Sequence, residues 1–235
     1  MNDYLQISAK NLGSLALPSA CDRCTWIRLH AKKLPYQIFP GIFSSIDAYS
    51  KKIQAAHYQR ESRLLPWFVE AGLNGEPLKA PHWKAFNIVD EQSAVILTGM
   101  PDEVLALEDG SYAIIDYKTS KFTKGQDSLM PMYEVQLNAY AYIGERLDLN
   151  PVSRLVLAYY EPQTDAAAIS LDDVLQADGF WMGFAPHLVD IPLRTENIES
   201  LLWKARSIYD LPTPPEKREG CEDCAALDNI FELLR

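Results

Sequence analysis

Two carboxylates and one ammonium stand at a spacing that a single β-hairpin can bring together. Pro101-Asp102 is followed by thirteen residues and then by Asp116-Tyr117-Lys118. Two carboxylates that face each other repel unless a cation lies between them, and oxygen ligands of this kind suit magnesium or manganese. A metal ion can activate water and stabilise charge on phosphoryl oxygens, and a lysine can assist it, so this set suits phosphodiester hydrolysis.

The turn between these motifs predicts how the three charges meet. Residues 108–110 (EDG) suit a three-residue hairpin loop with glycine in the left-handed position, between the apolar runs DEVLAL and SYAII. Pairing Leu107 with Ser111 then sets Asp102 opposite Asp116. Because side chains alternate along a strand, the lysine two residues later projects from the same face. The alternative is that these are solvated charges where two strands fray.

The segment after the hairpin predicts a helix over residues 131–146. It has a proline in its first turn, apolar residues at helical spacing and Gly144 near its end. Gln136 and Tyr140 lie four residues apart, so they share one face of this helix. The sequence therefore places two more polar side chains close to the hairpin in the chain.

Taken together, the motifs G-x-P-D, D-x-K and Q-x3-Y in residues 97–142 resemble the PD-(D/E)xK nuclease superfamily, in its RecB-like branch. That branch includes exonuclease domains of bacterial recombination helicase-nucleases of the AddB type and the CRISPR-adaptation nucleases. The resemblance implies an α/β restriction-endonuclease-like core. It also implies a metal-dependent DNA nuclease that acts on single strands or DNA ends in repair, recombination or CRISPR adaptation. Its partners would be DNA and a helicase or another recombination or CRISPR-adaptation protein.

The resemblance further implies a role for each motif residue. The two aspartates would bind Mg²⁺ or Mn²⁺ together with the backbone carbonyl of Tyr117. Lys118 would position the attacking water and offset phosphate charge. Gln136 and Tyr140 would orient the site and touch the nucleic-acid backbone.

A further metal ligand is expected from an N-terminal helix, because the RecB-like branch often completes its metal site with a histidine or an acid from such a helix. Residues 45–63 have apolar side chains at helical spacing and predict an amphipathic helix. His57 on this helix is the candidate ligand, and Asp47 and Glu61 are alternatives.

All four cysteines fall into two C-x2-C pairs, Cys21/Cys24 and Cys221/Cys224. The sequence shows no secretory signal and no apolar run that could span a bilayer, so we expect a cytoplasmic protein with reduced thiols and no membrane partner. The four thiolates then predict a site for Zn²⁺ or a 4Fe-4S iron–sulfur cluster that clips the chain ends together. The RecB-like branch usually binds its cluster with one early and three late cysteines, so the two-plus-two pattern leaves both occupants open.

The net charge of −10 argues at first against a nucleic-acid partner, because phosphate binding is driven by lysine and arginine. Residues 1–85, however, carry 11 basic and 6 acidic side chains. These side chains can form a surface that guides a nucleic-acid strand, with aromatic rings on which bases stack. The alternative is that the charges lie on solvated helix faces and the aromatic rings lie in the core. The residues concerned are Arg23, Arg28, Lys32, Lys33, Lys51, Lys52, Arg60 and Arg63, with Trp26, Tyr49 and Tyr58 among them.

The order of elements predicts one structural domain of the α/β class, with a mixed central β-sheet flanked by helices. We expect a helical N-terminal part over residues 1–85 with the first cysteine pair, and the nuclease core over 86–210. Residues 211–235 should form a cysteine segment that packs on the N-terminal part. Within the core, 153–160 predict a buried strand that pairs with 166–170, and a further strand is expected near 186–193.

Two other classes of function remain open at this point. One is a catalytically inactive nucleic-acid-binding subunit with the same fold. The other is a cysteine-cluster scaffold or redox-responsive protein in which the charges of the hairpin are incidental.

Overall fold

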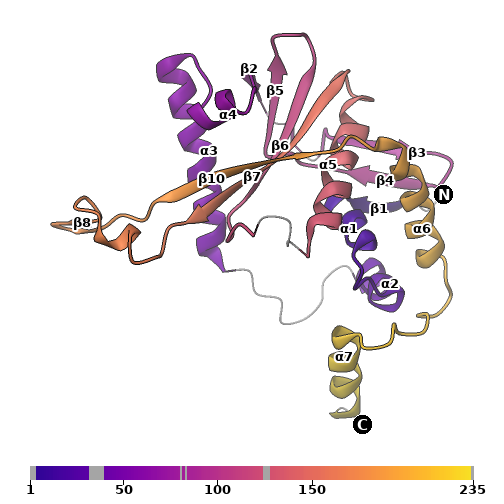
Figure 1. The fold of residues 1–235 in the computed structure, drawn as a ribbon. Coiled ribbons are helices and arrows are strands. Elements are labelled where there is room, and N and C mark those ends of the chain that lie inside the picture. Colours follow the sequence, from indigo (N-terminus) through magenta and orange to yellow (C-terminus); the bar gives the residue numbers. More distant parts are fainter. Residues whose placement is uncertain (1–3, 32–39, 80, 83, 124–127, 234–235) are drawn as a thin grey trace.

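The computed structural model describes residues 4–31, 40–79, 81–82, 84–123 and 128–233, and a five-stranded sheet lies at its centre (Figure 1). The strands lie in the order β10-β7-β6-β5-β2. Strands β6 and β7 are parallel, and the other neighbours are antiparallel. The expected mixed sheet flanked by helices is therefore confirmed. Its strands are β2 Gly75–Leu78, β5 Glu103–Leu107, β6 Tyr112–Lys118, β7 Val152–Pro162 and β10 Phe184–Ile191.

Strands β5 and β6 form the hairpin that the sequence predicts. The backbone N–H of Leu107 donates to the carbonyl of Ser111 at 2.8 Å, and Gly110 has a φ of 84°. The ladder begins with Glu103 opposite Ile115, which is the predicted register. Since the ladder begins there, the two aspartates of the motif lie together at the open end of the hairpin.

Helix α5, Met130–Gly144, connects β6 to its parallel neighbour β7 and is buried over most of its length. It is enclosed because the sheet packs on one side and the short helix α1, Ala9–Gly13, packs on another. A Cβ atom on Gly13 would lie 2.4 Å from the carbonyl oxygen of Met132, so this close approach of the two helices requires glycine. The tight packing holds the polar residues of α5 in fixed positions.

The remaining helices flank the sheet or lie below it (Figure 1). Helix α4 and the leucines on either side of it pack on one face of the central sheet. Helices α5 and α6 pack on the other face. Among the helices of the described ranges, none is long and apolar enough to cross a membrane. The helices not yet given are α2 Asp22–Ala31, α3 Gly41–Glu61, α4 Pro66–Glu70, α6 Ile198–Tyr209 and α7 Glu222–Leu233.

A second sheet of three strands lies beside the core and includes the first strand of the chain. Strand β1, Leu5–Ser8, pairs in parallel with β4, Val95–Thr98, and β3, Asn87–Asp90, pairs with β4 on its other side. The expectation of a helical N-terminal part did not include β1 or β2. Residues of β1 are alternately buried and exposed, which suits a strand with one face on the core.

Beyond the central sheet, β7 and β10 lead into an arm that projects from the body of the protein (Figure 1). The small strands β8, Leu175–Gln176, and β9, Gly179–Phe180, pair with each other in this arm. The expected pairing of residues 166–170 with β7 is wrong, because residues 168–170 form a 3-10 helix. The partner of β7 is instead the longer strand β10, which confirms the strand expected near 186–193.

Candidate active site and cysteine cluster

Asp102 lies at the start of the hairpin, and its two carboxylate oxygens have different partners. Oδ2 accepts a hydrogen bond from the backbone N–H of Tyr117 at 2.8 Å. Oδ1 lies 2.7 Å from Nζ of Lys51, a residue of α3. The same ammonium lies 2.8 Å from Oδ2 of Asp47, one turn earlier on α3. The backbone of β6 thus fixes the orientation of the Asp102 carboxylate, and a lysine from a distant helix offsets its charge.

Asp116 is more deeply buried, with 4% of its surface exposed. Its Oδ1 accepts a hydrogen bond from Nε2 of Gln136 at 3.1 Å, and its Oδ2 forms an ion pair with Lys118. Burial raises the pKa of Asp116 to about 6; the charge of Asp102 adds to this effect and Lys118 opposes it. The carboxylate is therefore costly to ionise in the metal-free protein, and a bound cation would lower that cost.

Gln136 and Tyr140 reach the site from α5, as the spacing of the motif predicts. Nε2 of Gln136 bridges Asp116 and the Tyr140 hydroxyl, which it contacts at 2.8 Å. Oε1 of Gln136 is buried and, among the described residues, has no hydrogen-bond partner. A Cβ atom on Gly99 would lie 2.8 Å from the Tyr140 ring, so glycine in the G-x-P-D motif makes room for this tyrosine.

Lys118 lies on the same side of β6 as Asp116, which precedes it by two residues. Its Nζ contacts the Asp116 carboxylate and lies 4.4 Å from the centre of the Tyr133 ring. The ring face attracts the ammonium, so the lysine is held between a carboxylate and an aromatic ring. The structure thus brings Asp102, Asp116 and Lys118 together with the two polar residues of α5.

The structure does not bring His57 into this group. Among the described residues, the four cysteines form the one group of three or more potential metal ligands whose ligand atoms lie close together. His57 is not part of that group. His57 lies six residues beyond Lys51 on α3 and lines a separate cavity with Glu61. Its role as a metal ligand stays a prediction. Of the two alternatives, Asp47 is the one linked to Asp102, through Lys51.

Lys51 is the residue of this site whose place the sequence reasoning missed. The sequence pattern indicates only that it belongs to the basic residues of a strand-guiding surface, of which Lys32 and Lys33 lie outside the described residues. Burial lowers the pKa of Lys51, but Asp102 and Asp47 outweigh this effect and raise it, so the side chain stays charged. In the sequence, the i, i+4 spacing of Asp47 and Lys51 indicates an ion pair on one face of a helix. The spacing does not indicate which other part of the protein that face contacts.

The opposite face of the hairpin carries a second buried polar cluster. The Tyr117 hydroxyl donates a hydrogen bond to Oε2 of Glu103. Burial raises the pKa of Glu103, although the hydrogen bond from Tyr117 partly opposes it. Gln54 is a buried residue of α3. A buried amide of α3, the helix that carries Lys51, therefore lies near this cluster.

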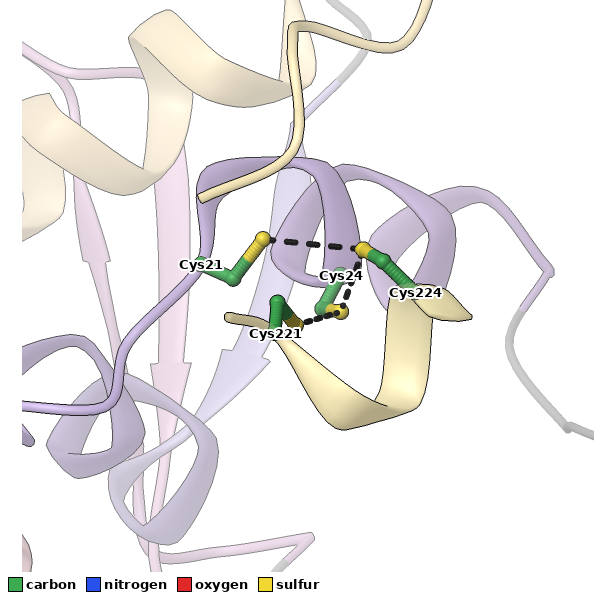
Figure 2. Close-up of side chains that lie close together, drawn as sticks. All are labelled: Cys21, Cys24, Cys221 and Cys224. Carbon is green, nitrogen blue, oxygen red and sulfur yellow. Dashed lines mark hydrogen bonds between the residues drawn. The ribbon is translucent and has the colours of Figure 1, made fainter. Parts of the chain in front are cut away.

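The four cysteines meet where α2 and α7 begin (Figure 2). Their sulfurs lie within 4.8 Å of one another, and none is in a disulfide. Sγ of Cys24 is 3.5 Å from that of Cys221 and 3.2 Å from that of Cys224, and Cys21 and Cys224 are 3.7 Å apart. A disulfide has an S–S distance of about 2.05 Å, so these are separate thiols gathered around one point.

The surroundings of the sulfurs shift the pKa of Cys21 in the opposite direction to those of Cys24 and Cys224. Burial works to raise the pKa of Cys21, but hydrogen bonds led by the backbone N–H of Arg218 outweigh it and lower the pKa to about 6. Burial raises the pKa of Cys24 and raises that of Cys224 to about 11. A cation that binds all four thiolates would therefore release protons when it binds.

Ion pairs support the contact between the two ends of the chain. Asp228 on α7 lies 2.8 Å from Arg23 on α2 and 2.8 Å from Lys217 in the connection before α7. With the four sulfurs, these contacts hold α7 beside α2, as Figure 1 shows. The structure thus places α7, with the second cysteine pair, beside α2.

Comparison with known proteins adds to this geometry. The crystal structure of SSO0001 aligns with 89% of this chain and 78% of its own, with 15% sequence identity and a TM-score of 0.48. A search of the curated proteins found no match. The family described as the PD-(D/E)XK nuclease superfamily matches residues 17–228, a span that contains the paired aspartates, the lysine and all four cysteines. With most of its length matched, the chain belongs to the PD-(D/E)XK nuclease superfamily.

Proposed function

We propose that the protein is a Mg²⁺- or Mn²⁺-dependent nuclease that hydrolyses phosphodiester bonds of DNA. The observation that carries this proposal is the meeting of Asp102, Asp116 and Lys118 at the open end of one hairpin. Membership of the superfamily supports the general activity, because its members are typically nucleases. The metal, the nucleic acid and the pathway are our own proposals.

The donor set of the site fits a hard divalent cation. Two carboxylates lie close enough for the charge of Asp102 to raise the pKa of Asp116, and each is partly neutralised by a lysine. The unpartnered Oε1 of Gln136 lies beside them as a further acceptor. Oxygen donors of this kind suit Mg²⁺ and Mn²⁺. When bound, such an ion would polarise the phosphoryl oxygens and favour ionisation of the attacking water.

The side chains of the protein have separable tasks in this proposal. The two aspartates hold the cation, with the Tyr117 carbonyl as a proposed third ligand. Lys118 presents its ammonium to the phosphate and orients the attacking water. Gln136 fixes the Asp116 carboxylate through a hydrogen bond, and Tyr140 holds Gln136 in turn.

We further propose a RecB-like nuclease that acts on single strands or DNA ends in repair, recombination or CRISPR adaptation, together with a helicase or another protein of such a pathway. The support is the order of the motifs, with D-x-K followed by Q-x3-Y, and the observation that Gln136 does contact Asp116. The positive balance of residues 1–85 gives the strand a place to approach.

For the cysteine site we propose a single metal ion, with zinc as the first candidate. A Zn–S bond of about 2.3 Å in a tetrahedron gives sulfurs about 3.8 Å apart. Three of the observed separations are 3.2 to 3.7 Å, and all the sulfurs lie within 4.8 Å of one another, which is close to this value. In a 4Fe-4S cluster each cysteine binds a different iron, so the sulfurs must lie further apart. The alternative would be shown by a brown protein that contains iron and acid-labile sulfide.

A nuclease assay with a matched pair of variants tests the proposed activity. Labelled single- and double-stranded DNA and RNA are incubated with the purified protein and Mg²⁺ or Mn²⁺. Asp102→Asn changes the carboxylate at the open end of the hairpin, and Glu108→Gln changes an exposed acid at the turn end. We expect DNA cleavage that needs added metal, that Glu108→Gln retains and that Asp102→Asn loses.

Each other result has a definite meaning. Undiminished cleavage by Asp102→Asn would refute the assignment of the site. Cleavage of RNA but not DNA would refute the proposed substrate. Tight DNA binding without cleavage under any metal would favour the catalytically inactive binding subunit.

A further inference from the structure

Lys51 belongs to α3, but its ammonium contacts two carboxylates at the candidate active site. Its Nζ is 2.7 Å from Oδ1 of Asp102 and 2.8 Å from Oδ2 of Asp47. The other oxygen of Asp102 accepts a hydrogen bond from the backbone N–H of Tyr117, so both oxygens of this carboxylate are in use. A cation that binds Asp102 through Oδ1 therefore takes the place that the ammonium of Lys51 occupies.

The ammonium can leave Asp102 and still keep a partner. Asp47 lies one helical turn before Lys51, so the two side chains stay within reach of each other on the same face of α3. The side chains of Lys51 and Asp47 are 33% and 41% exposed, so solvent leaves them room to move. A lysine has a flexible four-carbon stem, and its charge can shift by several ångströms while the helix stays in place.

The distance that the ammonium must move to meet a substrate phosphate is short. Mg²⁺ binds oxygen ligands at about 2.0–2.1 Å, so a phosphate oxygen on the same ion lies within about 4.2 Å of a coordinating carboxylate oxygen. Nζ of Lys51 already lies 2.7 Å from one oxygen of Asp102. A displaced ammonium therefore stays close to the phosphate, which carries the opposite charge.

The charges of the site indicate that a phosphate is attracted only after the ion binds. Three carboxylates and two ammoniums meet here, so at neutral pH this group has a net charge of −1. A phosphodiester is an anion, and a site of this charge repels it. A divalent cation changes the net charge of the same group from −1 to +1, which attracts one phosphate. The charged residues are Asp47, Asp102, Asp116, Lys51 and Lys118.

We propose that Lys51 is a substrate-binding residue whose contact depends on the metal ion. Its ammonium neutralises Asp102 in the metal-free protein, and it binds a non-bridging phosphate oxygen of the nucleic acid once the divalent ion is bound. The inference rests on the proposed nuclease function and adds a second lysine to its site. Lys51 reaches the phosphate from α3, and Lys118 reaches it from β6. Metal binding and substrate binding are then coupled, because the ion frees a residue that holds the substrate.

Binding measurements with and without Mn²⁺ test this coupling. Fluorescein-labelled oligo(dT) is titrated with the full-length protein carrying Lys118→Met, which keeps every carboxylate of the site and removes the lysine that the proposed cleavage needs. Lys51→Met, Lys51→Arg and Lys52→Met are each added to this parent variant. Lys52→Met is the matched control, because Lys52 is the next residue of α3, carries the same charge and is exposed.

In saturating Mn²⁺ we expect Lys51→Met to weaken oligo(dT) binding by about tenfold, which is typical of one lost hydrogen bond to a charged group. The slope of log Kd against log salt concentration should decrease by about 0.7, the value for one lost phosphate contact with a single strand. Without Mn²⁺, Kd and slope should match those of the parent variant. Lys51→Arg should retain the contact. Lys52→Met should change binding by the same factor with and without the ion.

The dependence on metal separates substrate binding from a structural role of Lys51. If this lysine only held α3 against the hairpin, Lys51→Met would weaken DNA binding equally with and without Mn²⁺, and that result would overturn the proposal. An unchanged Kd in saturating Mn²⁺, or no oligonucleotide binding at all, would also overturn it.

Cleavage assays on the protein without Lys118→Met distinguish this proposal from the nuclease function itself. A metal-dependent loss of binding in a protein that never cleaves DNA would keep the role of Lys51 and reject the nuclease. Cleavage without any metal-dependent loss of binding would keep the nuclease and reject the role of Lys51.

Discussion

The carboxylate site and the cysteine cluster are built in opposite ways. The carboxylate site comes from one hairpin and the next helix, and lysines of the protein already offset its charges. The cysteine cluster joins residues from the two ends of the chain, and its sulfurs lie against each other. The protein itself therefore balances part of the charge of the hairpin, whereas a bound metal ion would link the four cysteines. We infer that the first ion exchanges freely and the second is part of the fold.

The largest expected effect is the loss of activity in Asp116→Asn. We expect cleavage to fall by at least about a thousandfold, because the variant removes a carboxylate that no neighbouring acid replaces. The metal content of the cysteine site should stay the same, which elemental analysis of the purified variant checks. Loss of both the activity and the cysteine-bound metal would contradict the independence of the two sites.

Removing a cysteine should have the reverse effect. In Cys24→Ser we expect hydrogen exchange of the α7 amides to accelerate by at least about a hundredfold, because the proposed metal ion would hold this helix in place. The amides of β6 should keep their protection. Mass spectrometry of exchanged peptides measures both, and Asp223→Asn, in the first turn of α7, is the control. Equal loss of protection in β6 would show that the cluster holds up the whole fold.

The stability of the metal-free carboxylate site should depend on pH in a defined direction. Burial raises the pKa of Asp116 from 3.8 to about 6, so the folded state holds this proton more tightly than the unfolded chain does. The contribution of Asp116 to stability therefore falls as the pH rises from about 4 to about 6 and stays low above that range. The shift corresponds to a penalty of up to about 3 kcal/mol.

Denaturant unfolding of Asp116→Asn without added Mg²⁺ or Mn²⁺ measures this penalty. The variant should be more stable than the parent protein at about pH 7.5, and the advantage should vanish below about pH 4. An inactive variant that is also more stable would show that activity is not lost through unfolding. A variant that is less stable at both pH values would contradict the assigned cost of the buried charge.

Lys51 should compete with the metal ion for Asp102. We expect Lys51→Met to tighten Mn²⁺ binding by about threefold to tenfold, because the ion no longer displaces an ammonium from Oδ1. Calorimetric titration with Mn²⁺ measures the change. Lys52→Met, which alters the next and exposed residue of α3, is the control. Weaker binding by Lys51→Met would show that this lysine supports the site instead.

The smallest effect is expected at the ion pairs beside the cysteines. Asp228→Asn breaks the contacts with Arg23 and Lys217, which are partly exposed to solvent. The unfolding midpoint should fall by less than about 3 °C, and high salt should remove the difference. A larger decrease would mean that charge, and not the metal ion, holds α7 in place.

The sequence predicts well those features that local geometry decides. Turn chemistry and strand alternation are enough to set the hairpin register, and helical spacing is enough to place Gln136 and Tyr140 on one face. The four cysteines are grouped by their chemistry alone, since a reduced and buried set of four thiols has few other uses. These predictions need no knowledge of how distant segments pack.

The features that the sequence did not reveal depend on long-range packing. Lys51 reaches Asp102 because α3 packs across the hairpin, and no fixed spacing links the two segments. Residues 5–8 become a strand because β4 offers them an edge to pair with. Residues 166–170 do not pair with β7, because β10 pairs along eight residues of that strand.

A metal ion at the cysteine cluster would also change the connectivity of the chain. With a metal ion bound to both pairs, the chain from Cys21 to Cys224 is a closed ring, and closing so long a loop removes much of the freedom of the unfolded state. A protease cut in the extended stretch at 211–220 would leave both fragments joined. Before the thiolates released their ion, the segment between the two cysteine pairs could not separate from α2 at its C-terminal end.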